Sequence, residues 1–431
     1  MFNVLLKLYF ALIAVSSASL YGNVVDTYGL SAKGTSLGNA FTAGGDSAFA
    51  AQTNPATLTN QEQSSVAIGY QVTSLSLKDL SSATTEDASG LPASDYQASE
   101  AKPVSGSSFG LNLALSKNVH FGLSGYMPTD SFGKLTGNAP NEVNYLRSAD
   151  RQQRPAIYTA AAIKFGNLSV GLGTYYTLKA DGTLQMSLNN KASAARFDLS
   201  MVPVISPYGG LQWQQATDFG SWSAGFFYRA AQSTKSNLDT YLAVGAIGED
   251  SSATLPLAIQ TSLVPFYDPE LIRIGFNVQT SRLGVYSTIE FARWSKFEAP
   301  FIYLEGEDIT SLTERNNPAE LKLDDTIAYK LGSSYLIDDS QNLEVRMGLE
   351  HHQSATRSES ISGIVDPTRT IVAFGAGMEI LKSQLPEGKS AKLDVTYQRS
   401  ILSETDVGSD ANTAVAGGYT DTVIGGVSYD L

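Results

Sequence analysis

Side chains that could perform acid–base or metal chemistry are few in this sequence. It has no cysteine and only three histidines, which are His120 and the adjacent pair His351 and His352. Neighbouring residues of a strand point to opposite faces, so this pair does not offer two ligands to one metal. We find no glycine-rich phosphate loop. We therefore expect no metal, no cofactor and no enzymatic activity, and a rim hydrolase using His351 or His352 is the least favoured alternative.

The composition and the first residues indicate an exported protein. Residues 1–18 contain Lys7, an apolar run from Leu8 to Val15 and small residues before a cut after Ala18, which predicts a signal peptide. The net charge is −13, which argues against nucleic acid as a partner. Only 16% of the residues are charged, yet no later apolar run is long enough for a transmembrane helix. Apolar residues dispersed in this way are typical of barrel strands.

Alternating apolar residues mark about fourteen strands between Ser64 and Leu431. The expected segments lie near 64–77, 109–115, 119–123, 157–165, 168–176, 203–215, 222–228, 272–278, 283–291, 323–331, 343–349, 372–378, 393–397 and 419–431. These ranges mark the clearest alternation, and we expect most of the strands around them to be about nine to twelve residues long, enough to cross a bilayer when tilted.

The connections between these segments alternate in length. Short turns are expected at 116–118, 166–167, 217–218, 280–282, 338–341 and 382–390. Long polar loops are expected near 78–103, 128–154, 179–202, 230–270, 295–320, 351–370 and 402–418. Turns on one side and loops on the other predict an all-β, closed transmembrane antiparallel barrel in residues 64–431. A soluble all-β sandwich is the alternative.

Residues 19–63 precede the first expected strand and have no place in the barrel wall. A barrel of this circumference is too wide for side chains alone to fill, so it is either open or plugged. The segment is rich in Gly and Ala and breaks at Asn54, Pro55 and Ala56. We expect it to fold as a hatch inside the lumen, because it is too apolar for a disordered periplasmic tail.

The stretch YGLSAKGTSLGNAFTAGGDSAFAAQTNPATL, with its Asn-Pro-Ala element, resembles the hatch of the FadL family of outer-membrane transporters for long-chain fatty acids and other hydrophobic compounds. The stretches GLSGYMPTDSFGKL, IEFARWSKFEAP and VDPTRTIVAFGAGMEI continue the resemblance along the mature chain. The sequence departs from the family pattern at Thr57, directly after Asn-Pro-Ala, where the family commonly has Gly. The resemblance implies a fourteen-stranded barrel plugged by the hatch, an internal ligand site, and a lateral exit through a kink in the third strand. Gly122 and Gly125 are the candidates for that kink.

An internal site for a fatty acid would need a cation for the carboxylate. The strand phases predict five inward cations, namely Lys164, Arg229, Arg273, Lys330 and Arg346. The inward acids Glu290, Glu344 and Glu379 could pair with them. If nearly all the cations are neutralised in this way, the ligand is expected to be an uncharged hydrocarbon instead.

The sequence therefore predicts a Gram-negative outer-membrane channel for passive uptake of hydrophobic compounds, most of all long-chain fatty acids. The alternatives are an aromatic hydrocarbon channel of the same fold and a structural or adhesive barrel. We expect contact with outer-membrane lipid and lipopolysaccharide, and insertion by the barrel assembly machinery. Burial of a methylene releases about 0.8 kcal/mol, so a greasy path suits such a ligand better than an aqueous pore.

Overall fold

The structure is a computed structural model of the 431-residue chain. It describes residues 23–80, 103–129, 143–148, 153–188, 193–234, 236–245, 254–263, 266–297, 323–338, 342–356, 364–380, 385, 389–409 and 412–431. The predicted signal peptide, residues 1–18, lies outside the described residues.

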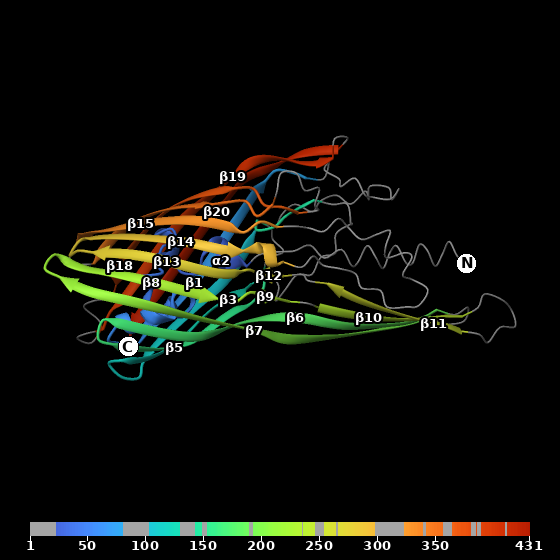
Figure 1. Ribbon diagram of the computed structural model, residues 1–431, viewed down its shortest axis with the longest axis horizontal. Helices are drawn as coiled ribbons and strands as arrows, with labels where there is room; N and C mark the ends of the chain where they lie inside the picture. The colour runs from blue at the N-terminus through green and yellow to red at the C-terminus, as the bar shows by residue number, and fades with distance from the viewer. Residues whose placement is uncertain are drawn as a thin grey trace.

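Fourteen antiparallel strands close into a barrel (Figure 1). They are β1 (Ser65–Leu77), β2 (Val104–Ala114), β3 (Val119–Pro128), β5 (Ala156–Phe165), β6 (Leu168–Leu188), β7 (Ser193–Thr217), β8 (Gly220–Arg229), β13 (Glu270–Gln279), β14 (Leu283–Arg293), β15 (Thr326–Asp338), β16 (Leu343–His352), β18 (Arg369–Ile380), β19 (Ala391–Ser409) and β20 (Asn412–Asp430). Each pairs with its neighbour in this order, and β1 pairs with β20 to close the ring. The predicted closed antiparallel barrel and its number of strands are confirmed.

The alternation along each strand separates an apolar outer face from a polar and small inner face. On β1, Ile68 is 66% exposed, whereas the inward Gln71 is 1% exposed. The same contrast recurs on β13, where Ile274 and Phe276 are exposed and Arg273 is buried. This is the pattern of a barrel that has hydrocarbon outside and a filled lumen inside.

Three of the segments that the sequence predicts to be long loops consist largely of strand. β6 and β7 stay paired as far as Leu188 and Ser193, within the expected loop 179–202, and β19 and β20 continue through most of 402–418. The expected loop 230–270 contains β9 (Gln232–Ser233), β10 (Ser236–Gly245), β11 (Thr254–Leu263) and β12 (Tyr267–Asp268). Backbone hydrogen bonds pair these strands whatever their side chains are, so hydrophobic periodicity alone does not identify them.

The long β6–β7 hairpin projects beyond the barrel, toward the right of Figure 1, and carries β10 and β11 on its edge. Two smaller pairings join loop segments, one within the expected loop 230–270 and one between the expected loops 128–154 and 351–370. β9 pairs with β12, and β4 (Asn144–Tyr145) pairs with β17 (Ile364–Val365).

The N-terminal segment, residues 23–63, consists of short helical turns that lie within the ring of strands, where it is blue in Figure 1. They are α2 (Val24–Tyr28), α3 (Ala32–Ser36), η1 (Ser47–Phe49), α4 (Ala50–Thr53) and η2 (Pro55–Asn60). α3 contacts β16, β18, β19 and β20, whereas η2 contacts β3, β5, β6 and β7. The segment therefore touches the inner wall on opposite sides.

Local sequence accounts for the short helices of this segment. The side chains of Asn23, Ser31 and Asn54 cap α2, α3 and η2, and Pro55 occupies the first turn of η2. Within the described ranges, none of the helices is long and apolar enough to cross a membrane.

Candidate functional site: the filled lumen

The Asn-Pro-Ala element lies against the inner face of β6, β7 and β8. Asn54 is completely buried, and its Oδ1 accepts a hydrogen bond from the Ala56 amide at 3.1 Å. Its Nδ2 donates to the carbonyl of Thr42 at 2.6 Å and to the wall carbonyl of Leu211 at 3.2 Å. Asn54 therefore caps η2 and at the same time joins two parts of the N-terminal segment to the wall.

Inward glycines of the wall make room for the N-terminal segment. We call them the glycine girdle: Gly110, Gly122, Gly171, Gly210, Gly225, Gly275, Gly332, Gly348 and Gly375, one on each of nine strands. A Cβ at Gly110 would lie 2.6 Å from the carbonyl oxygen of Ala48, and one at Gly171 would collide with the backbone of Pro55 and Ala56. The segment approaches the wall this closely only because side chains are missing there.

Gly122 and Gly125, the predicted kink, lie in the third strand with their pairing intact. Gly122 is opposite Asn112 and Ala160, and Gly125 is opposite Phe109 and Ile157. A Cβ at Gly122 would meet Leu58 of the N-terminal segment at 2.6 Å, so this glycine belongs to the girdle. Neither glycine interrupts the wall in this structure, and a lateral opening there stays a prediction.

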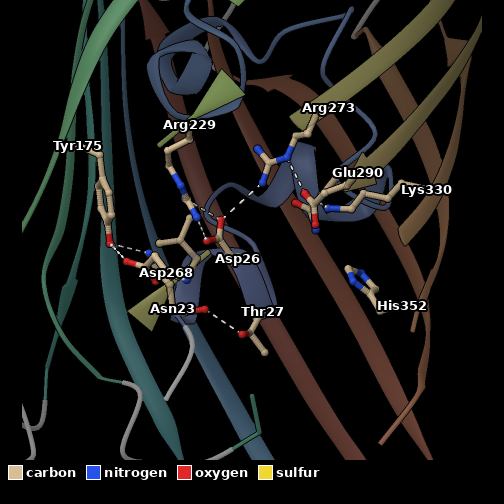
Figure 2. A network of polar contacts seen from close by, with 12 residues as sticks. Asn23, Asp26, Thr27, Tyr175, Arg229, Asp268, Arg273, Glu290, Lys330 and His352 are labelled. Atoms are coloured by element: carbon tan, nitrogen blue, oxygen red, sulfur yellow. Dashed lines mark hydrogen bonds and ion pairs between the residues drawn. The ribbon is translucent and has the colours of Figure 1, made fainter. Parts of the chain in front are cut away.

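Four of the five predicted inward cations are buried and paired. Arg229 and Arg273 lie 2.7 and 3.5 Å from the Asp26 carboxylate of α2. Arg273 and Lys330 also contact Glu290, at 2.5 and 3.0 Å. Figure 2 shows Arg229 of β8 and Arg273 of β13 reaching Asp26 of α2. Glu290 of β14 and Lys330 of β15 lie together beside Arg273. The predicted partner Glu290 is thus shared by two cations.

The same network extends in both directions along the wall. On one side, Asp268 accepts from Arg154 at 2.5 Å and from the Tyr175 hydroxyl at 3.0 Å. On the other side, Glu350 lies 3.8 Å from Lys330 and 2.9 Å from His352. Lys330 and His352 are labelled in Figure 2. We call the whole set the ion-pair layer: Asp26, Arg154, Arg229, Asp268, Arg273, Glu290, Lys330 and Glu350. Its four cations face four carboxylates.

The remaining predicted cations differ from one another. Arg346 is paired with Glu344 at 2.6 Å and with Asp394 at 2.5 Å. Lys164 lies at the end of β5 beside a short turn and makes no ion pair among the described residues. The predicted acid Glu379 accepts a hydrogen bond from Asn342 at 2.5 Å.

Sequence reasoning missed several residues of the lumen, namely Asp26, Arg154, Asp268, Glu350, Asp394 and Arg369. Asp26 is the acid that neutralises Arg229, but 203 residues separate them and no spacing rule connects them. Arg369, at the start of β18, is 3% exposed, and its Nε has no hydrogen-bond partner. It makes no ion pair within the described ranges, although its strand register places it opposite His352. Its inward phase on β18 was the signal that could have found it.

The pKa values of two carboxyl groups in the N-terminal segment are shifted in opposite directions. Burial favours the neutral form of Asp26, but the charges of Arg229 and Arg273 outweigh it and lower the pKa of this carboxyl. For Asp46, burial dominates and raises the pKa, although Lys33 and a hydrogen bond from Ser31 favour the charged form. Both groups lie inside the lumen, so the difference comes from how closely a cation approaches.

The lumen contains a small cavity between the N-terminal segment and the ion-pair layer. It has a volume of about 20 Å³ and is bordered by Asp26, Gly34, Thr42, Arg273 and Lys330, among others. That is room for about one water molecule. A hydrophobic molecule could enter this cavity only if the N-terminal segment or its neighbours moved.

Comparisons with known proteins agree with this architecture. No family model matches the chain. It is 23% identical over 252 residues to alkane uptake protein A of Marinobacter nauticus, covering 56% of this chain and 53% of that protein. It is 26% identical over 178 residues to outer membrane protein P1 of Haemophilus influenzae, covering 38% and 36%. These matches thus span about half or less of the relatives' length.

Solved structures match over nearly the whole chain. A Pseudomonas aeruginosa FadL homologue aligns with a TM-score of 0.56 at 14% identity, covering 96% of this chain and 99% of that one. The Ralstonia pickettii toluene transporter TbuX aligns with a TM-score of 0.54 at 16% identity, covering 94% and 99%. These relatives are named as transport or outer-membrane proteins and not as enzymes, in agreement with the expected absence of catalysis. The chain is an outer-membrane β-barrel with the fold of the FadL homologues.

Proposed function

We propose that the protein is a passive uptake channel for hydrophobic compounds, and that its main substrates are uncharged hydrocarbons. The supporting observation is the pairing of Arg229, Arg273, Lys330 and Arg346 with protein carboxylates. A fatty acid that used one of these cations would have to displace a buried carboxylate. Leaving that carboxylate unpaired costs about 3–5 kcal/mol. An uncharged hydrocarbon does not compete for these cations, so its binding leaves the carboxylates paired.

Long-chain fatty acids are the second candidate, and Arg369 is the observation that favours them. This guanidinium is buried and has no ion pair among the described residues, so a carboxylate could bind there without displacing another. The two candidates therefore differ in the need for Arg369. The names of alkane uptake protein A and of TbuX, a toluene transporter, add support for an uncharged substrate.

We further propose that residues 19–63 act as the hatch of a barrel formed by residues 64–431, after removal of residues 1–18. Asn54, Pro55 and Ala56 would gate the path because they form the start of η2 and contact the wall. Extensive burial of the N-terminal segment supports this role. Insertion by the barrel assembly machinery and contact with lipopolysaccharide are part of the same proposal.

Paired uptake measurements test the substrate. n-Hexadecane and palmitate differ at one chain end by a carboxylate, and both can be supplied in labelled form to cells with and without the gene. We expect the gene to accelerate hexadecane uptake, and we expect Arg369→Gln to leave that rate unchanged. Gene-dependent palmitate uptake that is lost in Arg369→Gln would support the second candidate. If neither compound depends on the gene, the two alternatives are an aromatic hydrocarbon channel of the same fold and a structural or adhesive barrel.

A further inference from the structure

The outer face of the barrel has an apolar hollow where β6, β7 and β8 meet. We call it the β7 groove. Its volume is about 350 Å³, and the outward side chains around it include Leu172, Pro207, Leu211, Phe226 and Tyr228. Nearly all of its accessible lining is apolar. The groove is therefore a place on the membrane-facing surface where the wall lacks a side chain.

Gly209 is the cause of the groove. The strand registers place it directly between Leu172 of β6 and Tyr228 of β8, so a large side chain on each side borders an empty position. A Cβ at Gly209 would stand 2.9 Å from Cδ2 of Leu172, at the flexible end of that side chain. Any larger residue would occupy the hollow and continue the apolar surface across the three strands.

The groove opens to the bilayer and not to the lumen. Leu172 is 70% exposed, and Leu211, Phe226 and Tyr228 are also exposed on the outer face. The pairing of β6 with β7 is continuous from Leu168 to Leu188, so no gap leads inward. On the inner side, Gly171 and Gly210 are covered by Pro55 and Asn54. The occupant must therefore come from the membrane.

We propose that the β7 groove seats one acyl chain of an outer-membrane lipid. The groove is many times larger than the lumen cavity that holds about one water molecule, so it has room for part of a flexible acyl chain. An unfilled hollow would forfeit dispersion contacts on its walls, whereas a flexible chain can fill it. Since other lipid tails are also surrounded by hydrocarbon, the preference comes from packing alone and is modest.

Tryptophan fluorescence offers a direct probe of this seat. The chain has three tryptophans. Trp213 lies on the outer face of β7, two residues beyond Leu211, while Trp222 lies on β8 and Trp294 is buried. A Trp222→Phe background leaves Trp213 as the reporter at the groove. The protein is then placed in bilayers of phosphatidylcholine that carries bromine atoms along its acyl chains, because bromine quenches tryptophan on contact.

The matched variants are Gly209→Leu and Gly425→Leu. Gly425 is also an outward glycine, on β20 between the exposed Val423 and Val427, but a Cβ there would meet nothing within 4 Å. Both variants add the same side chain to the lipid face, and only one fills the groove. Gly209→Ala, which adds a single carbon beside Leu172, serves if the larger residue prevents folding.

We expect brominated lipid to be retained at Trp213 when unbrominated lipid is added in excess, with an affinity a few-fold above that of bulk lipid. Gly209→Leu should lower this relative affinity to about one, and Gly425→Leu should leave it unchanged. The proposal is overturned if quenching in the parent protein falls in proportion to the brominated fraction of the bulk lipid. It is also overturned if quenching is equal in all variants. Neither result depends on which compound the barrel transports.

Discussion

The lumen has two levels, and they hold the N-terminal segment by different means. In the ion-pair layer, Asp26 of the segment meets Arg229 and Arg273 of the wall at 2.7 and 3.5 Å. In the glycine girdle, the segment touches wall backbone because side chains are absent, as at Gly171 and Pro55. The first level depends on charge and the second on shape. Substitutions that change one without the other can measure what each contributes.

The largest effect is expected from Asp26→Asn, which removes the only carboxylate paired with Arg229 among the described residues. Leaving a buried cation unpaired should weaken docking of the segment by about 3–5 kcal/mol. Hydrogen exchange of residues 24–36 measures this as faster exchange of amides in α2 and α3. Lys78→Met, which breaks the exposed pair with Glu404, is the control and should cost about 0–1 kcal/mol. If the two variants weaken docking of the N-terminal segment equally, the ion-pair layer does not hold that segment in place.

Gly171→Val tests the girdle. The new side chain would collide with Pro55 and Ala56, and such overpacking costs about 1–3 kcal/mol. We expect faster exchange of the amides in η2, with little change in α2. Gly425→Val is the control, because that position has open space on the outer face. If both variants behave like the parent protein, the segment does not depend on close contact with the wall.

Pro55→Ala should have a smaller effect, about 0.4–1 kcal/mol, because the proline restricts the unfolded chain more than it contributes contacts. We expect the barrel to remain folded, the hatch to loosen and the rate of hydrocarbon uptake to change. Labelled hexadecane in whole cells provides the measurement. An unchanged rate, with the loosening confirmed by hydrogen exchange, would count against gating by this element.

The smallest effect on stability is expected at Asp46, whose pKa is shifted in the opposite direction to that of Asp26. Its pKa is raised in the folded protein, so its contribution to stability is present at low pH and is lost as the pH rises through the folded pKa. Asp26 has a lowered pKa, and its contribution is lost only as the pH falls through that lower value. Asp46→Asn should therefore leave stability at neutral pH unchanged or slightly higher. A loss as large as that of Asp26→Asn would contradict this comparison.

The sequence predicts the outer wall better than the lumen, and the reason is physical. Ile68 and Ile274 alternate with inward residues because lipid covers one face, so a period of two is enough to predict the strands. The inward phases of Arg229 and Lys330 follow from the same rule. Their partners do not, because Asp26 reaches Arg229 across 203 residues, and the girdle works only once the N-terminal segment is in place.

A reversible tether tests the central claim most directly. Thr42 of the N-terminal segment and Thr288 of β14 lie with their hydroxyl oxygens 3.1 Å apart, and the chain has no cysteine of its own. The pair Thr42→Cys and Thr288→Cys can therefore be oxidised to a single disulfide that fixes the segment to the wall. If hydrocarbons pass by movement of this segment, oxidation should stop hexadecane uptake and reduction should restore it. Undiminished uptake with the disulfide fully formed would contradict the account.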